Sequence, residues 1–170
     1  PFTETAFFDF DHFSQVAASA MRLSDDLVEL EVEKLDNIIK ACDTSDEVEL
    51  WENLKDACVN GRRTGLGTHG LADALACLSL AYDSEEAIKV IDKIYATLKI
   101  SAYTESVNLA RERGAFPVFN WDKEKDNAYI KNLPKDVQDL IAKFGRRNIS
   151  ILTNAPTGSV SIMSQTSSGI

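Results

Sequence analysis

The sequence has few residues suited to metal binding or redox chemistry. Its 170 residues include three cysteines and two histidines. Cys42, Cys58 and Cys77 form no CxxC pair, so we expect neither a metal site nor a disulfide framework. Buried reduced thiols, typical of intracellular proteins, are the simpler interpretation. We expect His12 to be solvated and His69 to be a structural or surface histidine rather than a catalytic base.

Basic residues and long apolar runs are also scarce. Lys and Arg total 18 against 27 Asp and Glu, which gives a net charge of −9. Because an acidic surface repels phosphate backbones, we expect no nucleic acid as partner. The dense basic spots are the pairs Arg62-Arg63 and Arg146-Arg147, which are sufficient for one small anion and not for a duplex.

No apolar run approaches the roughly 18 to 20 residues that span a bilayer. The stretch Pro1–Phe10 lacks the basic start of a secretion signal. We therefore expect no membrane partner and a cytoplasmic location.

Hydrophobic periodicity predicts a mainly helical α/β chain that forms a single domain over residues 1–170. Asp9 or Asp11 would cap the first helix and Ser84 the fourth. The expected helices cover residues 10–41, 47–59, 71–78, 85–113 and 135–144. The glycine-rich stretch 62–67 and the β-rich stretch 148–155 are expected to be short strands, and 115–134 a loop.

The segment from Asn154 to Ser161 (NAPTGSVS) is the most informative one for function. It joins a predicted strand to a predicted helix, and glycine allows the backbone to come close to a ligand. Thr157, Ser159 and Ser161 offer hydroxyls beside the unpaired N–H groups of a helix start, an arrangement that favours phosphate. A capped helix without a ligand is the alternative.

Two nucleotide-binding patterns are absent or weak. The P-loop pattern GxxxxGK[ST] does not occur. Residues 65–70 spell GxGxxG, but the basic residues before it and the lack of an acid at the expected strand end argue against a dinucleotide fold.

Five blocks resemble the large, catalytic subunit of ribonucleotide reductases, in the order and spacing of that family. They are NGRRTGLGTHGLADAL (60–75), YDSEEA (82–87), ESVNLARERGAFPVF (105–119), GRRNISILTNAPTGSVSI (145–162) and SSGI (167–170). The TGLGTHGLAD and APTGS blocks are most similar to the adenosylcobalamin-dependent (class II) branch. The resemblance covers nearly the whole chain.

The resemblance implies a fragment of the ten-stranded α/β barrel of this family, with the long helices outside. It implies that the full enzyme reduces ribonucleotides to 2′-deoxyribonucleotides by radical chemistry, with adenosylcobalamin as cofactor. Its partners would be a ribonucleoside di- or triphosphate and the remainder of the reductase chain. The loop that holds the substrate phosphates matches Pro156, Thr157, Gly158, Ser159 and Val160.

The family's radical chemistry also needs a cysteine in an NxCxE-like finger loop and a redox cysteine pair. Cys42 in KACDT, Cys58 in DACVN and Cys77 in LACLS match none of these. We therefore assign no catalytic residue, no metal ligand and no bound cofactor to this piece, and expect it to be inactive alone. The alternative function is a non-catalytic helical binding or assembly module derived from a reductase.

The aromatic residues Phe116, Phe119 and Trp121 resemble a base-stacking platform, but their acidic surroundings favour a role in covering the core.

Overall fold

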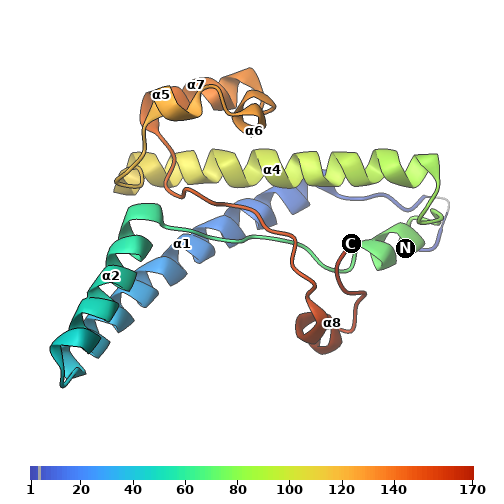
Figure 1. The fold of residues 1–170 in the computed structure, drawn as a ribbon. Coiled ribbons are helices and arrows are strands. Elements are labelled where there is room, and N and C mark those ends of the chain that lie inside the picture. Colours follow the sequence, from blue (N-terminus) through green and yellow to red (C-terminus); the bar gives the residue numbers. More distant parts are fainter. Residues whose placement is uncertain (4) are drawn as a thin grey trace.

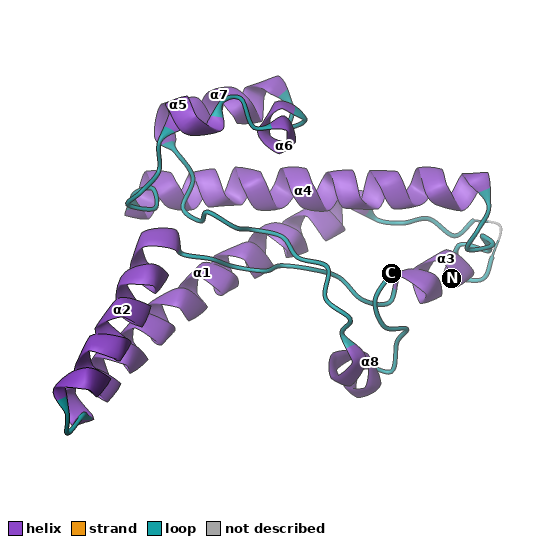
Figure 2. Cartoon of the chain, in the orientation of Figure 1, coloured by secondary structure: helices purple, strands orange, loops and turns teal. Residues whose placement is uncertain are grey.

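The fold is seen in a computed structural model that describes residues 1–3 and 5–170. Helices and loops make up this part of the chain (Figure 2). The helices are α1 (Phe10–Ala41), α2 (Ser45–Gly61), α3 (Leu71–Cys77), α4 (Glu85–Arg113), α5 (Trp121–Glu124), α6 (Ala128–Lys131), α7 (Lys135–Phe144) and α8 (Gly158–Ser164). None of these helices has an apolar stretch long enough to cross a bilayer.

The long helices α1 and α4 form the centre of the fold. Helix α1 packs against α4 and against α2, while α5, α6 and α7 lie on another side of α4 (Figure 1). The main core contains side chains from α1, α4, α6, the α6–α7 connection, α7 and the 148–155 segment: Met21, Ala102, Tyr103, Val107, Ile130, Leu133, Val137, Ile141 and Ile151. Phe119 and Trp121 pack against this core, and Phe116 is buried, so the core-covering role predicted for these aromatics is confirmed.

A second, smaller core joins α3 to the start of α4. The buried residues there are Leu71, Leu75, Ala87 and Ile94, and the aromatic side chains of Phe8 and Phe13 pack against them. This core fixes the position of the start of α3.

Several helix limits follow the sequence closely. Helices α1 and α7 cover their predicted ranges, and Asp9 caps α1 by accepting from the His12 N–H. Ser84 caps α4 by accepting from the Ala87 N–H, and α4 ends at Arg113 with Gly114 as its C-cap. These confirmed limits reflect local caps, which depend on a few neighbouring residues.

Other predicted limits are wrong. Helix α2 begins at Ser45 because Thr44 and Glu47 form a capping box, and it extends to Gly61. The stretch 115–134 is not all loop, because the Asn120 and Asn127 side chains cap the short helices α5 and α6.

The two predicted strands are also corrected. In the described residues, the 62–67 and 148–155 stretches are extended and run side by side (Figure 1), but they share one isolated parallel bridge, Leu66 with Leu152. A regular strand is stabilised by partners along its length, and two short segments alone rarely form a stable sheet. The helical part of the predicted α/β fold is confirmed, whereas a barrel is not seen in this part of the chain.

Candidate functional site

The predicted phosphate loop follows the extended 148–155 segment, which is hydrogen-bonded to the extended 62–67 segment. Thr64 N–H donates to the Ser150 carbonyl at 2.9 Å, and Thr153 N–H donates to the Leu66 carbonyl at 3.0 Å. A Cβ added to Gly67 would lie 2.5 Å from the Thr153 carbonyl oxygen. The glycine therefore permits the close backbone approach that the sequence suggested.

The loop itself, Pro156–Val160, lies at the start of α8. Thr157 has left-handed backbone angles (φ 55°, ψ 24°), and Ser161 N–H makes the first helical bond, to the Thr157 carbonyl at 2.9 Å. The amides of Gly158, Ser159 and Val160 precede that bond and have no backbone acceptor among the described residues. A Cβ added to Gly158 would meet nothing within 4 Å, so the loop is open at this point.

Two of the three hydroxyls expected to face a ligand have internal partners instead. Thr157 Oγ1 donates to the Pro156 carbonyl at 2.8 Å and accepts from the Gly169 N–H at 2.9 Å. Ser161 Oγ donates to the Gly158 carbonyl at 2.8 Å. Ser159 is exposed, and its hydroxyl has no partner in the described part of the chain. The sequence pattern gave no sign of the Thr157 contact with Gly169, because that partner lies beyond α8 in the chain.

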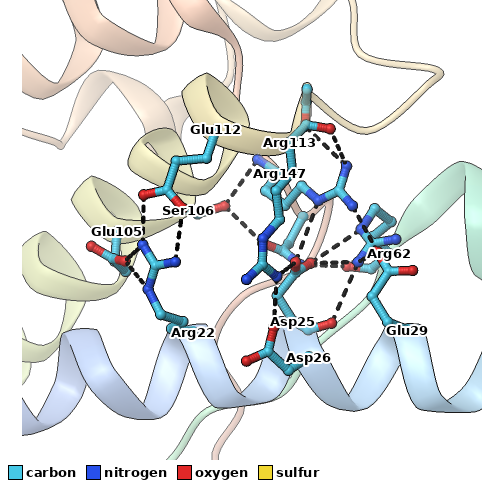
Figure 3. A network of polar contacts seen from close by, with 12 residues as sticks. Arg22, Asp25, Asp26, Glu29, Arg62, Glu105, Ser106, Glu112, Arg113 and Arg147 are labelled. Carbon is cyan, nitrogen blue, oxygen red and sulfur yellow. Dashed lines mark hydrogen bonds and ion pairs between the residues drawn. The ribbon is translucent and has the colours of Figure 1, made fainter.

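A buried carboxylate, Asp25 on α1, lies where the two extended segments begin (Figure 3). Its side chain is fully buried and accepts from Arg62 Nη2 at 2.8 Å, Asn148 Nδ2 at 3.0 Å, Arg113 Nη1 at 3.1 Å and Arg147 Nε at 3.4 Å. Glu29, one turn along α1, also pairs with Arg62 and Arg147, at 2.8 and 2.9 Å. We call these residues the Asp25 cluster: Asp25, Glu29, Arg62, Arg113, Arg147 and Asn148.

The electrostatics of Asp25 result from two opposing effects. Burial alone would raise its pKa, but the hydrogen bond and positive charge of Arg62, with help from Asn148 and Arg147, outweigh burial and hold the pKa below the usual aspartate value. The cluster continues into α4, where Ser106 Oγ donates to Asn148 Oδ1 at 2.9 Å. It therefore ties the starts of both extended segments to α1 and α4.

Three of the four arginines in the two basic pairs are not free to bind an anion, contrary to the expectation from the sequence, whereas Arg63 is exposed. Arg62 and Arg147 are buried in the Asp25 cluster. Arg146 is also buried, and it pairs with Glu124 at 2.8 Å and donates to the carbonyls of Asn148 and Ile149. These arginines stabilise the fold through internal carboxylates.

The histidines lie as predicted. His12 is exposed, and His69 Nδ1 lies 2.8 Å from the Thr166 hydroxyl, a structural contact.

Cys42, Cys58 and Cys77 are free thiols, as predicted, but the prediction that they are buried is wrong, because each is only partly buried. Burial, with nearby carboxylates, raises the pKa of the Cys42 and Cys58 thiols, which disfavours the reactive thiolate. Within residues 1–3 and 5–170, no group of three or more acidic, histidine or cysteine side chains is placed to hold a metal ion.

The chain is similar in sequence to a family model and to several known proteins. The family model described as "Ribonucleotide reductase, barrel domain" matches residues 2–170. The chain is 32% identical over 162 residues to a protein of Mycobacterium tuberculosis (strain CDC 1551 / Oshkosh) named "Vitamin B12-dependent ribonucleoside-diphosphate reductase", covering 95% of this chain and 19% of that relative. A Thermoplasma acidophilum protein of the same name is 29% identical over 165 residues, covering 95% of this chain and 17% of the relative.

A further relative comes from Treponema pallidum and is named "Ribonucleoside-diphosphate reductase subunit alpha". It is 32% identical over 115 residues, which cover 64% of this chain and 14% of the relative. The chain thus spans about a fifth or less of the length of these relatives. The match over residues 2–170 confirms the resemblance found in the sequence motifs, and the chain belongs to the ribonucleotide reductase family, within its barrel domain.

Proposed function

We propose that this chain forms part of the catalytic domain of an enzyme that reduces ribonucleotides to 2′-deoxyribonucleotides, and that Pro156–Val160 holds the substrate phosphates. The observation that carries the loop assignment is the open start of α8, where the amides of Gly158, Ser159 and Val160 precede the first helical hydrogen bond. Unpaired amides of this kind favour phosphate oxygens.

The loop residues divide into two roles in this proposal. Ser159, whose hydroxyl is exposed, and the three amides donate to the phosphates, while Thr157 and Ser161 shape the loop through their internal hydrogen bonds. A fixed phosphate restricts the ribose, and radical abstraction of a hydrogen atom requires such close placement. Because the relatives are named diphosphate reductases, we propose a ribonucleoside diphosphate as substrate.

The radical chemistry itself is assigned to the remainder of the reductase chain. None of the cysteines lies in an NxCxE motif. We therefore propose that residues 1–170 act within one larger catalytic domain, as substrate-binding scaffold. An NxCxE motif elsewhere in the parent reading frame is expected, and its absence would favour the alternative, a non-catalytic module. A cytoplasmic location stays a prediction.

For the cofactor, we propose adenosylcobalamin in the intact enzyme, because two of the relatives carry "Vitamin B12-dependent" in their names. The described residues do not fit this group. A cavity of about 440 Å³ between α4, α6 and the 152–154 segment has the size of a small-ligand pocket, whereas adenosylcobalamin is a macrocycle with a nucleotide tail. We therefore derive no step of the reaction through the cofactor in this part of the chain.

Substitution of Ser159 in the intact reductase tests the loop. Ser159→Ala should raise the KM for a ribonucleoside diphosphate about 5- to 30-fold, because one hydrogen bond to a charged group, worth about 1 to 2 kcal/mol, is lost. Gly158→Val should raise it further, since the space beside Gly158 is open and a side chain would occupy the place of the phosphate. The fold should tolerate both changes.

Ser45→Ala, at the exposed start of α2, is the matched control and should leave the KM unchanged. If Ser159→Ala and Gly158→Val both leave the KM within twofold of the unsubstituted enzyme, the loop does not hold the phosphates.

A further inference from the structure

The segment that follows α8 returns to the start of α3 and is held there by hydrogen bonds. Gly70 N–H donates to the Ser167 carbonyl at 2.8 Å, and His69 Nδ1 lies 2.8 Å from Thr166 Oγ1. Figure 1 shows this end of the chain beside α3. We call residues 166–169 the clasp.

The clasp completes the N-terminal cap of α3, which the local sequence leaves incomplete. Gly70 is the cap residue and has no side chain to offer. Ser167 N–H donates to Asp73 Oδ2 at 2.6 Å, and the Asp73 N–H donates to Ser167 Oγ at 3.4 Å. This is the reciprocal pattern of a capping box, formed here between residues 94 positions apart in the chain.

The clasp also reaches the predicted phosphate loop. Gly169 N–H, two residues after Ser167, donates to Thr157 Oγ1 at 2.9 Å. Thr157 has φ 55°, a region that β-branched residues rarely adopt and that persists only where the surroundings enforce it. The hydrogen bond from Gly169 is one of the contacts that hold Thr157 in this conformation, which sets the direction of the three amides that follow.

We infer that Asp73, through Ser167, is a positioning residue for the phosphate loop, although it lies on a different helix and does not contact the loop. This inference rests on the function proposed above. The path consists of contacts given by the structure: Asp73 holds Ser167, the short link to Gly169 is thereby fixed, and Gly169 holds Thr157. Loss of the Asp73 carboxylate should leave the loop present but less ordered, which weakens substrate binding more than turnover.

The experiment compares Asp73→Ala and Asp73→Asn in the intact reductase, with CDP as the varied substrate. Asp73→Ala should raise the KM about three- to tenfold, as expected for one lost hydrogen bond, and leave kcat within about twofold. Asp73→Asn keeps an oxygen that can accept from the Ser167 N–H, so it should restore a KM near that of the unsubstituted enzyme. Asp83→Ala removes an exposed carboxylate before α4 and is the matched control.

A second measurement follows the loop without substrate. Hydrogen exchange of peptides covering residues 157–170 should be faster in Asp73→Ala than in Asp73→Asn, with α4 peptides unchanged. A purely structural role for Asp73 would instead accelerate exchange throughout α3 and α4 and lower kcat. If Asp73→Ala reduces the yield of folded enzyme, Ser167→Ala removes only the hydroxyl that accepts from the Asp73 N–H and should raise the KM by a smaller factor.

The outcomes separate this inference from the proposed function. A raised KM in Ser159→Ala together with an unchanged KM in Asp73→Ala overturns the positioning role alone. An unchanged KM in Ser159→Ala, Gly158→Val and Asp73→Ala overturns the phosphate-loop assignment and the positioning role with it. Equal KM increases in Asp73→Ala and Asp73→Asn also refute the positioning role, because the hydrogen-bond acceptor would then not be what matters.

Discussion

Replacing Asp25 with asparagine should destabilise this chain more than any exposed acidic substitution. The carboxylate is fully buried and accepts hydrogen bonds from three arginines and Asn148. The side chains of Arg62 and Arg147 are only 5% and 10% exposed, so water cannot solvate their positive charges once the Asp25 carboxylate is lost. Asp25→Asn keeps the size of the side chain, so the change tests the charge rather than a cavity.

The expected loss is about 3 to 5 kcal/mol of unfolding free energy, the cost of removing one partner from a buried ion pair. Glu29 pairs with Arg62 and Arg147 and offsets part of this cost, which favours the lower end of the range. For a chain of this length, each kcal/mol corresponds to a change in Tm of about 2 to 4 °C. The Tm should therefore fall by at least roughly 6 °C.

Urea unfolding followed by circular dichroism at 222 nm measures this difference. Asp26→Asn is the matched control, because Asp26 is the next residue on α1, its side chain is 48% exposed and it pairs with Arg113. An exposed pair contributes about 1 kcal/mol or less. A loss below about 1 kcal/mol in Asp25→Asn, or an equal loss in both variants, would refute the view that the buried charge stabilises the fold.

The stability difference between the unsubstituted chain and Asp25→Asn should also depend on pH. The pKa of Asp25 is lowered in the folded state, so its stabilisation is complete above the unfolded-state pKa of about 3.9 and is lost as the pH falls through the folded-state pKa. The stability difference between the unsubstituted chain and Asp25→Asn should therefore be constant near neutral pH and shrink below about pH 4. A difference that persists unchanged at pH 3 would contradict this assignment.

Three further results are expected. Gly67→Ala should lower the stability of the chain markedly, because its Cβ would lie 2.5 Å from the Thr153 carbonyl oxygen. Gly158→Ala should not lower the stability, because the space beside Gly158 is open. Thermal melts compare the two variants, and equal Tm values would contradict the close approach at Gly67. Combined replacement of Cys42, Cys58 and Cys77 by serine should leave the turnover of the intact reductase within about twofold, and a complete loss of activity would show that a catalytic thiol had been missed. The 170-residue chain alone, incubated with adenosylcobalamin, a dithiol and ribonucleotides, should form no deoxynucleotide above a blank.

Local sequence signals determined the helices and the position of the candidate loop. The helical periodicity and caps at Asp9, Ser84 and Gly114 predicted the limits of α1 and α4, because each depends on residues a few positions apart. Glycines in the 62–67 stretch correctly indicated close backbone approach. Family-specific motifs identified the reductase family, as the match to residues 2–170 confirms.

Tertiary structure decided which polar groups are free and which are paired. Arg62 and Arg147 looked available for an anion, but Asp25, on the distant helix α1, binds both in the core. The hydroxyl of Thr157 looked available for phosphate, but the Gly169 amide occupies it. A residue's type shows what it can bind, whereas its partner depends on which distant segments the fold brings within hydrogen-bonding distance.

The extended segments also show which features the local sequence determined and which the tertiary structure determined. The β-rich composition of the 148–155 stretch indicated an extended backbone, which is what forms. Whether an extended segment becomes a regular strand depends on hydrogen bonds from neighbours along its length, and in the described residues this pairing amounts to one parallel bridge and a few adjoining bonds. Backbone conformation was thus set locally by the sequence, while strand formation and the reciprocal cap between Ser167 and Asp73 required contacts that only the folded chain provides.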